Sequence, residues 1–201
     1  MIDGIIRFDG KEVMRSEDIK LVGEHNRENY MAAICAVRDL VSDETIRSVA
    51  KSFAGVQHRL QLIREKDGVK FYNSSIDSSP SRTNAALSSF ECKNVIIILG
   101  GKDKKVPFDS LSKELAAKTK LAVLTGAAME KIYSDVANTD EYKEGKINFV
   151  KIPEFDDAVR YAASQAESGD FVVLSPACTS FDRFANFEQR GNYFTQIVNS
   201  L

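Results

Sequence analysis

The sequence predicts an α/β protein whose larger part is a doubly wound, mostly parallel β-sheet. Apolar runs rich in β-branched residues recur between residues 95 and 174, and each run ends in small or polar residues. Stretches with helical periodicity separate these runs. Continuous apolar strands that alternate with amphipathic helices are typical of a parallel sheet covered on both faces, with right-handed crossovers.

The sheet domain is predicted to begin at His58. Its first element is a hairpin over residues 60–72 that turns at Asp67-Gly68, because both turn positions tolerate a positive φ. The later strands are predicted over residues 95–99, 121–124, 149–152 and 171–174. The helices between and after them are predicted over residues 81–90, 108–119, 127–136, 155–166 and 182–198.

The first part of the chain, residues 1–57, is predicted to be a small α+β unit. A hairpin turning at Asp9-Gly10 precedes a helix over residues 29–40 and a second helix from Asp43, a possible N-cap, to a stop at Gly55. A hairpin and two helices make a thin core. We therefore expect this unit to pack on something absent from the chain or on the domain that follows, and we predict two domains, 1–57 and 58–201.

Composition excludes several classes of protein. The 201 residues carry 27 Lys and Arg against 29 Asp and Glu, a net charge of −2, which argues against a nucleic-acid-binding surface. No apolar stretch approaches the roughly 20 residues that span a bilayer, and no signal-peptide segment opens the chain. Three distant cysteines indicate reduced thiols, and two histidines give no zinc-ligand spacing. We expect a cytoplasmic monomer with neither a nucleic-acid nor a membrane partner and with no metal site.

Ligands of a doubly wound sheet bind beyond the carboxyl ends of its strands. The segment 100–105, Gly-Gly-Lys-Asp-Lys-Lys, follows the most apolar strand. Paired glycines let a backbone approach a ligand closely, and lysines meet carboxylates or phosphates. The segment matches neither G-x-G-x-x-G nor G-x-x-x-x-G-K-S/T, so neither nucleotide fingerprint applies, and a plain turn is the alternative.

Two further segments lie at this predicted edge. Hydroxyls and backbone N–H groups in 175–180 suit a carboxylate at a helix N-terminus, unless Thr179 or Ser180 merely caps the helix. Cys178 is expected to be a buried structural cysteine, since no histidine follows His58 to act as its base. The hydroxyl-rich segment 73–80 is, in its simplest interpretation, a solvated loop.

Other residues have two interpretations each. Arg59, at the domain boundary, can clamp a phosphate or pair with an acidic side chain. Asn26 is most simply a helix N-cap. The residues alone therefore indicate an α/β protein whose sheet edge suits anions.

Several of these segments together resemble the Mur ligases of peptidoglycan synthesis, and in particular their D-glutamate-adding branch. The resemblance covers nearly the whole chain and rests on residues 23–29 (GEHNREN), His58-Arg59, residues 100–104 (GGKDK) and residues 174–191 (LSPACTSFDRFANFEQRG). The last of these is highly specific, whereas H-N-x-x-N is shared with folylpolyglutamate ligases. The D-N-P-R motif of the diaminopimelate- or lysine-adding branch is absent.

This resemblance implies a Rossmann-like C-terminal domain, residues 58–201, preceded by the end of a Mur ligase central domain, residues 1–57. It implies a full enzyme that uses ATP and Mg²⁺ to phosphorylate the carboxylate of UDP-N-acetylmuramoyl-L-alanine. The amine of D-glutamate then attacks the acyl phosphate, and phosphate leaves. Catalysis of this kind depends on positioning and on charge stabilisation.

The resemblance also implies roles for single residues. Lys104 and Arg59 would be catalytic, with Arg59 on the ATP phosphates. The residues implied in D-glutamate binding are Lys104, Ser180, Phe181, Phe187 and Ser78. The residues implied in nucleotide binding are Asn26 and Asn29, which would contact adenine, and Arg59, Asn73, Ser74 and Asp77.

The chain departs from the family pattern in two ways. Ser74 replaces an aspartate that meets the nucleotide, and Ile76 replaces a lysine near the amino acid; Asp77 and Arg82 are candidates to take over these contacts. The family's phosphate loop, magnesium ligands, carbamylated lysine and UDP-binding domain all precede the first matching residue. We therefore expect a C-terminal fragment that is not a ligase by itself.

Two other hypotheses remain. The first is a non-catalytic amino-acid- or nucleotide-binding module, or a regulatory one, derived from a Mur ligase, which the changes at Ser74 and Ile76 favour. The second is an unrelated doubly wound hydrolase, which ranks last because it lacks a histidine base.

Overall fold

The computed structural model describes residues 3–21 and 23–201, without the side chain of His25. The chain divides into two compact units, Met1–Gly55 and Val56–Leu201. Within the described residues, no helix is both long and apolar enough to cross a bilayer.

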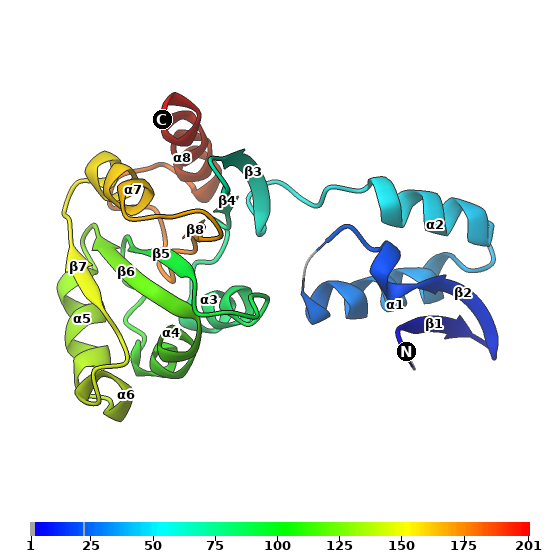
Figure 1. Cartoon of the computed structure of the whole chain (residues 1–201), viewed down its shortest axis with the longest axis horizontal. Helices are drawn as coiled ribbons and strands as arrows, with labels where there is room; N and C mark the ends of the chain where they lie inside the picture. Colours follow the sequence, from blue (N-terminus) through cyan, green and yellow to red (C-terminus); the bar gives the residue numbers. More distant parts are fainter. Residues whose placement is uncertain (1–2, 22) are drawn as a thin grey trace. The chain divides into compact units, whose positions relative to one another are not determined.

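The first unit is a hairpin followed by two α-helices (Figure 1). Asp9 and Gly10 both have a positive φ in the turn, as predicted. The helix predicted from residue 29 begins earlier, at Glu24 after Gly23, so Asn26 is not its N-cap. Ser42, rather than Asp43, caps the next helix, and its Oγ accepts a hydrogen bond from Thr45 N. The elements of this unit are β1 (Ile5–Phe8), β2 (Lys11–Arg15), η1 (Ser16–Asp18), α1 (Glu24–Val37) and α2 (Asp43–Ser52).

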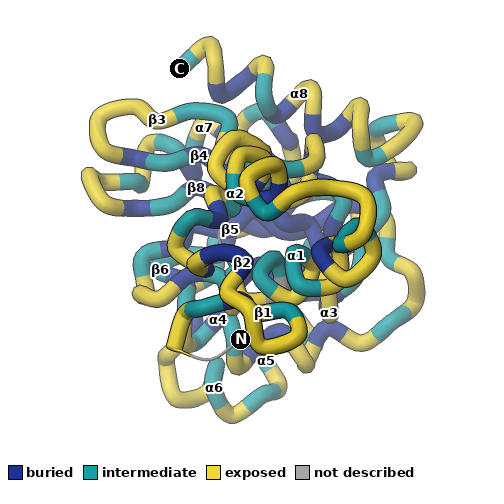
Figure 2. The backbone as a smooth tube through the Cα atoms, turned by 90° about the vertical axis from the view of Figure 1, so that its right-hand side faces the viewer, coloured by how far each residue is buried: buried dark blue, intermediate teal, exposed yellow. Residues whose placement is uncertain are grey.

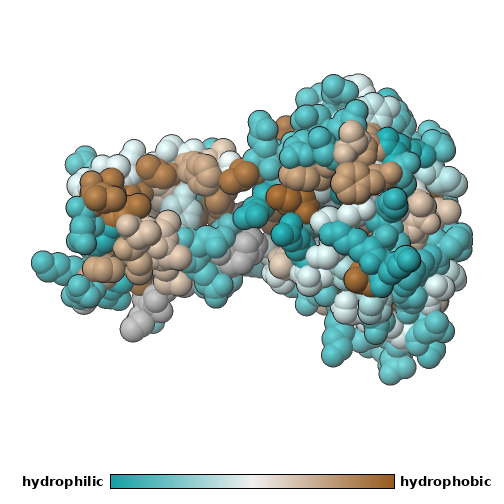
Figure 3. Space-filling view, turned by 180° about the vertical axis from the view of Figure 1, so that it is seen from behind, coloured by the Kyte–Doolittle hydropathy of each residue, from teal (hydrophilic) through white to brown (hydrophobic). Residues whose placement is uncertain are grey.

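The core of the first unit is small. Its buried members are Ile6, Val13, Met14, Ile19, Ile34, Ile46 and Ala50. Large apolar side chains also reach its surface, among them Leu40, Val49 and Phe53, and Figure 3 shows apolar surface on this unit. The assignment of this unit to the end of a central ligase domain stays a prediction.

The second unit is the predicted doubly wound sheet, with a strand order of β3-β4-β8-β5-β6-β7. The hairpin strand β3 pairs antiparallel with β4, and the other pairs are parallel. The strands are β3 (Gln61–Lys66), β4 (Val69–Asn73), β5 (Val95–Gly100), β6 (Thr119–Thr125), β7 (Phe149–Lys151) and β8 (Phe171–Leu174). The helices are α3 (Pro80–Leu87), η2 (Asp109–Leu111), α4 (Ser112–Lys118), α5 (Met129–Ala137), α6 (Asp140–Lys143), α7 (Phe155–Ser164) and α8 (Phe187–Ser200).

Helices cover both faces of this sheet (Figure 1). Leu87 of α3, Leu115 of α4 and Ile132 of α5 pack on one face. Phe155 of α7 and Phe194 of α8 pack on the other. Strand β5 is buried along its whole length, which Figure 2 shows in dark blue. This double cover explains why its sequence is a continuous apolar run without alternation.

The predicted helix over residues 182–198 begins later than expected, at Phe187. Asn186 is its N-cap and accepts a hydrogen bond from Gln189 N at 2.7 Å. Ser180 instead starts a short turn, in which its carbonyl accepts hydrogen bonds from Arg183 N and Phe184 N. The hydroxyls of residues 175–180 therefore do not lie at the N-terminus of a long helix, and neither Thr179 nor Ser180 is its cap.

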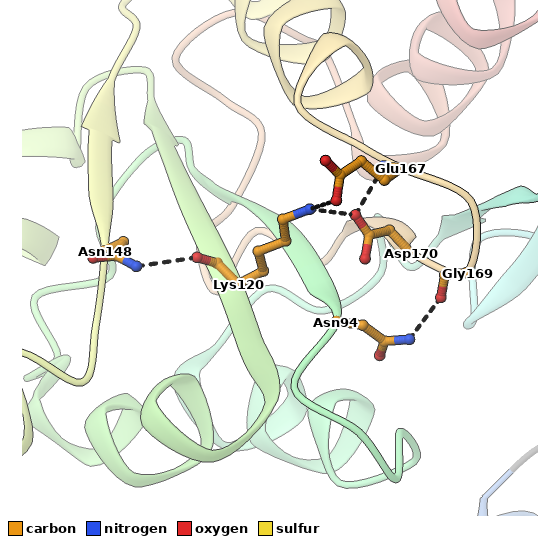
Figure 4. Close-up of polar contacts among 6 residues, drawn as sticks. All are labelled: Asn94, Lys120, Asn148, Glu167, Gly169 and Asp170. Atoms are coloured by element: carbon orange, nitrogen blue, oxygen red, sulfur yellow. Dashed lines mark hydrogen bonds and ion pairs between the residues drawn. The ribbon is translucent and has the colours of Figure 1, made fainter.

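Polar contacts tie the strands together at the amino edge of the sheet (Figure 4). Lys120 Nζ lies 2.8 Å from an oxygen of Asp170 and 3.0 Å from one of Glu167. Asn94 donates to the carbonyl of Gly169, and Asn148 donates to that of Lys120. These side chains precede or start β5, β6, β7 and β8, so this edge carries structural contacts.

The opposite edge gathers the segments in which the sequence predicts a site. Because β8 lies between β4 and β5, the loops that follow these three strands are neighbours. We call them the β4 loop (residues 74–79), the β5 loop (residues 101–105) and the β8 loop (residues 175–180).

Gly100, the last residue of β5, should be intolerant of a side chain. A Cβ there would lie 1.7 Å from the carbonyl oxygen of Thr125 on β6, and φ is +132°. We expect Gly100→Ala to lower the free energy of unfolding by about 3 kcal/mol or more, because the β5–β6 pairing must open. Urea unfolding followed by circular dichroism measures this loss.

Gly145 offers the matched control, since it also has a positive φ but a Cβ there meets nothing within 4 Å. Gly145→Ala should cost only the conformational strain, about 1 kcal/mol. Equal losses in the two variants would show that the close approach to Thr125 does not matter.

Candidate functional site

The β5 and β8 loops are joined by backbone hydrogen bonds. Lys102 N donates to Thr179 O at 2.8 Å, and Thr179 N donates to Lys102 O at 3.1 Å. Gly100 N also donates to Pro176 O. The lysine-bearing loop and the serine-bearing loop are therefore held side by side at the ends of their strands.

The β4 loop joins the β5 loop through side chains. Lys104 Nζ donates to Ser78 Oγ at 3.0 Å, although the two residues are 26 positions apart in the sequence. Lys104 is exposed and Ser78 is half-buried. Two residues to which the resemblance assigns D-glutamate binding thus meet at the carboxyl edge, where both can contact a ligand from solvent.

The side chain of Arg190 on α8 holds the β4 and β8 loops from inside the protein. It is only 2% exposed, and its guanidinium donates to Ser75 Oγ, Ser75 O and Cys178 O at 2.8–3.1 Å. Ser75 Oγ in turn donates to Phe187 O at 2.8 Å. Burial lowers the pKa of Arg190 to about 10, so the group stays protonated at neutral pH.

Arg190 is not among the site residues predicted from the sequence. A signal was nevertheless present, because Arg190 lies at helical spacing with the buried Phe194, Ile197 and Val198 of the same helix. An arginine at an apolar position of an amphipathic helix indicates a buried cation that needs acceptors.

His58 and Asn73 are anchored to the same helix. The ring of His58 is buried, and its Nδ1 lies 3.1 Å from Asn73 Nδ2. Asn73 also donates to the carbonyl of Gly191 at 2.9 Å, and a Cβ on Gly191 would lie 2.2 Å from His58 Nδ1. The rings of His58 and Phe187 are nearly perpendicular to each other, with centroids 6.1 Å apart. Asn73, implied in nucleotide binding, is thus fully enclosed by contacts within the protein.

Arg59 lies on the surface between two residues with strained backbones. His58 and Leu60 have φ values of 61° and 41°, in the left-handed region that L side chains rarely adopt. Their side chains are both buried, whereas Arg59 is exposed. This turn keeps the Arg59 side chain in solvent, and its charge acts on the carboxylate of Asp77.

Asp77 is a buried acid within the β4 loop. Its side chain is 6% exposed and accepts a hydrogen bond from Ser175 Oγ at 2.8 Å. Burial raises the pKa of Asp77 to about 6, against the opposing effects of hydrogen bonds from Ser74 and Ser175 and of the charges of Arg82 and Arg59. Ser74, whose Oγ also accepts from Leu60 N, is itself 1% exposed.

The remaining predicted residues lie in several environments. Ser180 is 2% exposed, Phe187 is half-buried, and Phe181 is 63% exposed. Asn26 and Asn29 belong to α1 of the first unit, whereas the edge that carries the other predicted residues belongs to the second unit.

Two further side chains of this edge bear on the alternatives. Arg82 Nη1 lies 3.3 Å from the carbonyl oxygen of Ile76. Cys178 is buried, and burial raises the pKa of its thiol to about 12, which confirms a structural cysteine. Within residues 3–21 and 23–201, no group of three or more His, Cys, Asp or Glu side chains is placed to hold a metal ion.

The raised pKa of Asp77 predicts a pH-dependent stability. The folded protein binds this proton more tightly than the unfolded chain, whose aspartates titrate near about 4, so the wild type loses stability as the pH rises from about 4 to about 6. Asp77→Asn keeps the shape of the neutral acid. The variant should be the more stable protein at neutral pH, by up to about 3 kcal/mol, and the difference should vanish near about pH 4.

Urea unfolding of both proteins across this pH range measures the difference. The exposed Glu91 provides the control, since Glu91→Gln should leave the profile unchanged. A difference between wild type and Asp77→Asn that does not vary with pH would contradict the raised pKa.

Comparisons with known proteins agree on one family. The sequence model described as "Mur ligase, glutamate ligase domain" matches residues 58–178. A UDP-N-acetylmuramoylalanine–D-glutamate ligase of Ruminiclostridium cellulolyticum is 49% identical over 192 residues, which cover 94% of this chain and 41% of that protein. The protein of the same name from Clostridium botulinum strain Hall is 48% identical over 196 residues, covering 98% of this chain and 43% of that protein. The chain thus spans about two fifths of the length of the curated relatives it matches.

Solved structures share the fold at low sequence identity. A pseudomurein peptide ligase type C from Methanothermus fervidus matches with a TM-score of 0.68 at 16% identity, over 98% of this chain and 39% of that one. The UDP-N-acetylmuramate-alanine ligase MurC of Thermotoga maritima matches with a TM-score of 0.65 at 16% identity, over 90% and 39% respectively. Because the family's sequence model covers more than half of its residues, the chain belongs to the Mur ligase family.

Proposed function

We propose that this chain forms the amino-acid-binding part of a D-glutamate-adding ligase of peptidoglycan synthesis. The observation that carries the proposal is the contact between Lys104 Nζ and Ser78 Oγ, which places a cation beside a hydroxyl at the solvent-facing edge. That pair is complementary to a carboxylate. The printed name of the relatives at 48–49% identity supports D-glutamate as the ligand.

The chemistry assigned to these residues is binding and orientation. Lys104 holds one carboxylate of D-glutamate, and Ser78 and Ser180 donate hydrogen bonds to its oxygens, with Phe187 and Phe181 lining the subsite. The free amine is thereby aimed at the acyl phosphate of UDP-N-acetylmuramoyl-L-alanine, which ATP has formed. Lys104 thus contributes catalytically by fixing the attacking group and by stabilising negative charge, not as a nucleophile.

The nucleotide is assigned to the neighbouring part of the edge. Arg59 is exposed on its strained turn and is suited to the ATP phosphates. Asn73, Ser74 and Asp77 are all buried, so they act by shaping the β4 loop beside the nucleotide. Asn26 and Asn29 of the first unit are assigned to adenine.

The remaining machinery is assigned to polypeptide beyond this chain. Mg²⁺ belongs to the ATP-dependent reaction, but the described residues offer no cluster of ligands for it. The phosphate loop, the metal ligands and the UDP-binding domain would come from the part of the relatives that this chain does not span. We also propose a cytoplasmic location and a monomeric state, the first of which agrees with three free cysteines.

The chain alone should not catalyse ligation. Incubated with ATP, Mg²⁺, D-glutamate and UDP-N-acetylmuramoyl-L-alanine, it should release no phosphate above background, because its sequence has no G-x-x-x-x-G-K-S/T loop and its described residues offer no group of metal ligands. Phosphate release is measured with a coupled assay. Adding the missing N-terminal part of a relative as a separate polypeptide should restore turnover. Robust turnover by the chain alone would contradict the assignment of the phosphate loop and metal ligands to that missing part.

Binding of D-glutamate should depend on Lys104. We expect weak binding by calorimetry and a loss of at least about tenfold in affinity in Lys104→Ala, since the variant lacks the charge-assisted contact. Ser180→Ala should weaken binding by a smaller factor. The matched control is Lys105→Ala, which removes the same charge from the next position of the β5 loop and should change the affinity by less than about threefold.

This experiment also distinguishes a ligase fragment from a regulatory module derived from a ligase. A regulatory module that has lost the ligase activity should ignore D-glutamate in every variant. Binding that survives unchanged in both Lys104→Ala and Ser180→Ala would show that the subsite lies elsewhere.

A further inference from the structure

Asp77 is the first member of a short buried chain of hydrogen-bonding groups. Its Oδ2 lies 2.8 Å from Ser175 Oγ, which lies 3.0 Å from Thr83 Oγ1. Thr83 Oγ1 lies 3.2 Å from the carbonyl oxygen of Ser175. All three side chains are buried, with Ser175 and Thr83 at 0% exposure. Water therefore does not compete for these contacts.

The number of protons in this chain depends on the ionisation state of Asp77. Three contacts join the four oxygen atoms, and the two hydroxyls bring two protons. When Asp77 is ionised, Ser175 donates to it, and Thr83 can serve only one of the two remaining contacts. When Asp77 is protonated, it donates to Ser175, Ser175 donates to Thr83, and Thr83 donates to the carbonyl. The neutral acid therefore completes the chain.

The charges around Asp77 favour the opposite form. Arg59 on the turn before β3 and Arg82 on α3 both stabilise the ionised carboxylate, and Arg190 on α8 also interacts with it. The hydroxyl of Ser74 donates to it as well. Burial of Asp77 and the buried chain of hydrogen bonds instead favour the neutral acid. The ionised and protonated forms of Asp77 are therefore close in free energy near neutral pH, and a change in charge nearby can shift the equilibrium between them.

The proposed ligand subsite lies next to Asp77. Ser78, the residue after Asp77, accepts the hydrogen bond from Lys104. An anion bound there adds negative charge beside the residue that follows Asp77 in the chain. This negative charge favours protonation of Asp77.

We propose that Asp77 is a proton-linked determinant of anion binding at this edge, so that a carboxylate held by Lys104 and Ser78 binds together with a proton taken up by Asp77 from solvent. This inference rests on the proposed function, with D-glutamate as the carboxylate, and adds a pH dependence to it. By linkage, the site binds its ligand more tightly as the pH falls through the range in which Asp77 titrates.

The test is calorimetric titration of the wild-type chain with D-glutamate at about pH 5.5, 6.5 and 7.5, whose two carboxylates stay ionised over this range. Each pH is measured in two non-binding buffers of different ionisation enthalpy, which gives the number of protons exchanged. We expect proton uptake on binding and an affinity about five- to tenfold higher at the lowest pH than at the highest.

Two substitutions make the test specific. Asp77→Asn should bind with an affinity that varies less than about twofold with pH and should match the wild type at low pH. Asp103→Asn is the matched control, because it removes a carboxylate from the β5 loop next to Lys104 and should retain the pH dependence. If the dependence persists in Asp77→Asn, another group carries it, and the inference is wrong.

A second measurement covers the case in which Asp77→Asn fails to fold. Carbon-detected NMR of the wild type follows the carboxyl of Asp77 directly, without ligand, with D-glutamate and with sulfate, which does not titrate in this range. We expect either anion to raise its pKa by about one unit, the shift that matches the predicted change in affinity. An Asp77 that titrates near about 4 without ligand, or that neither anion shifts, would overturn the inference.

Failure of the inference is distinguishable from failure of the proposed function. If D-glutamate binds with equal affinity at all three pH values and without proton uptake, the inference fails and the proposed function stands. If D-glutamate does not bind at the lowest pH but sulfate shifts the titration of Asp77, the proposed D-glutamate subsite fails, while the linkage between Asp77 and anions stands.

Discussion

The buried guanidinium of Arg190 is the constraint on which the carboxyl edge of the sheet depends. A cation removed from water needs acceptors within hydrogen-bonding distance. Nε and Nη2 of this one find them in Ser75 of the β4 loop and Cys178 of the β8 loop. These contacts link helix α8 to the β4 and β8 loops from inside the protein, where Arg190 is only 2% exposed.

The two edges of the sheet use polar side chains differently. At the amino edge, Lys120 pairs with the largely buried Asp170 and with the exposed Glu167, so its charge is used by groups of the protein itself. At the carboxyl edge, the contact between Lys104 and Ser78 lies in solvent, and each side chain has further capacity for a ligand. The carboxyl edge has this capacity because the strand order brings three loops together there.

Much of the fold follows from local sequence signals, and much of the site does not. The β-branched runs and the Asp67-Gly68 turn were sufficient to predict the strands and the first hairpin of the second unit, since both depend on neighbouring residues. The place of β8 between β4 and β5 depends on long-range pairing, which periodicity does not encode. The contact of Ser78 with Lys104 and the burial of Asp77 follow from that order. The start of α8 was misplaced because several residues upstream can cap a helix, and the structure uses Asn186.

The β4 loop bears most directly on whether this chain retains a ligase site. Its departures at Ser74 and Ile76 remove an expected carboxylate and an expected cation. In the structure, however, the carboxylate of Asp77 bonds to the hydroxyl of Ser74, and the guanidinium of Arg82 lies against the backbone of Ile76. Both kinds of charge are thus present beside the altered positions, carried by residues three and six places further along the chain. A buried carboxylate is costly unless it is hydrogen-bonded, and Ser74 and Ser175 supply those bonds to Asp77, so the altered loop remains a packed part of this edge.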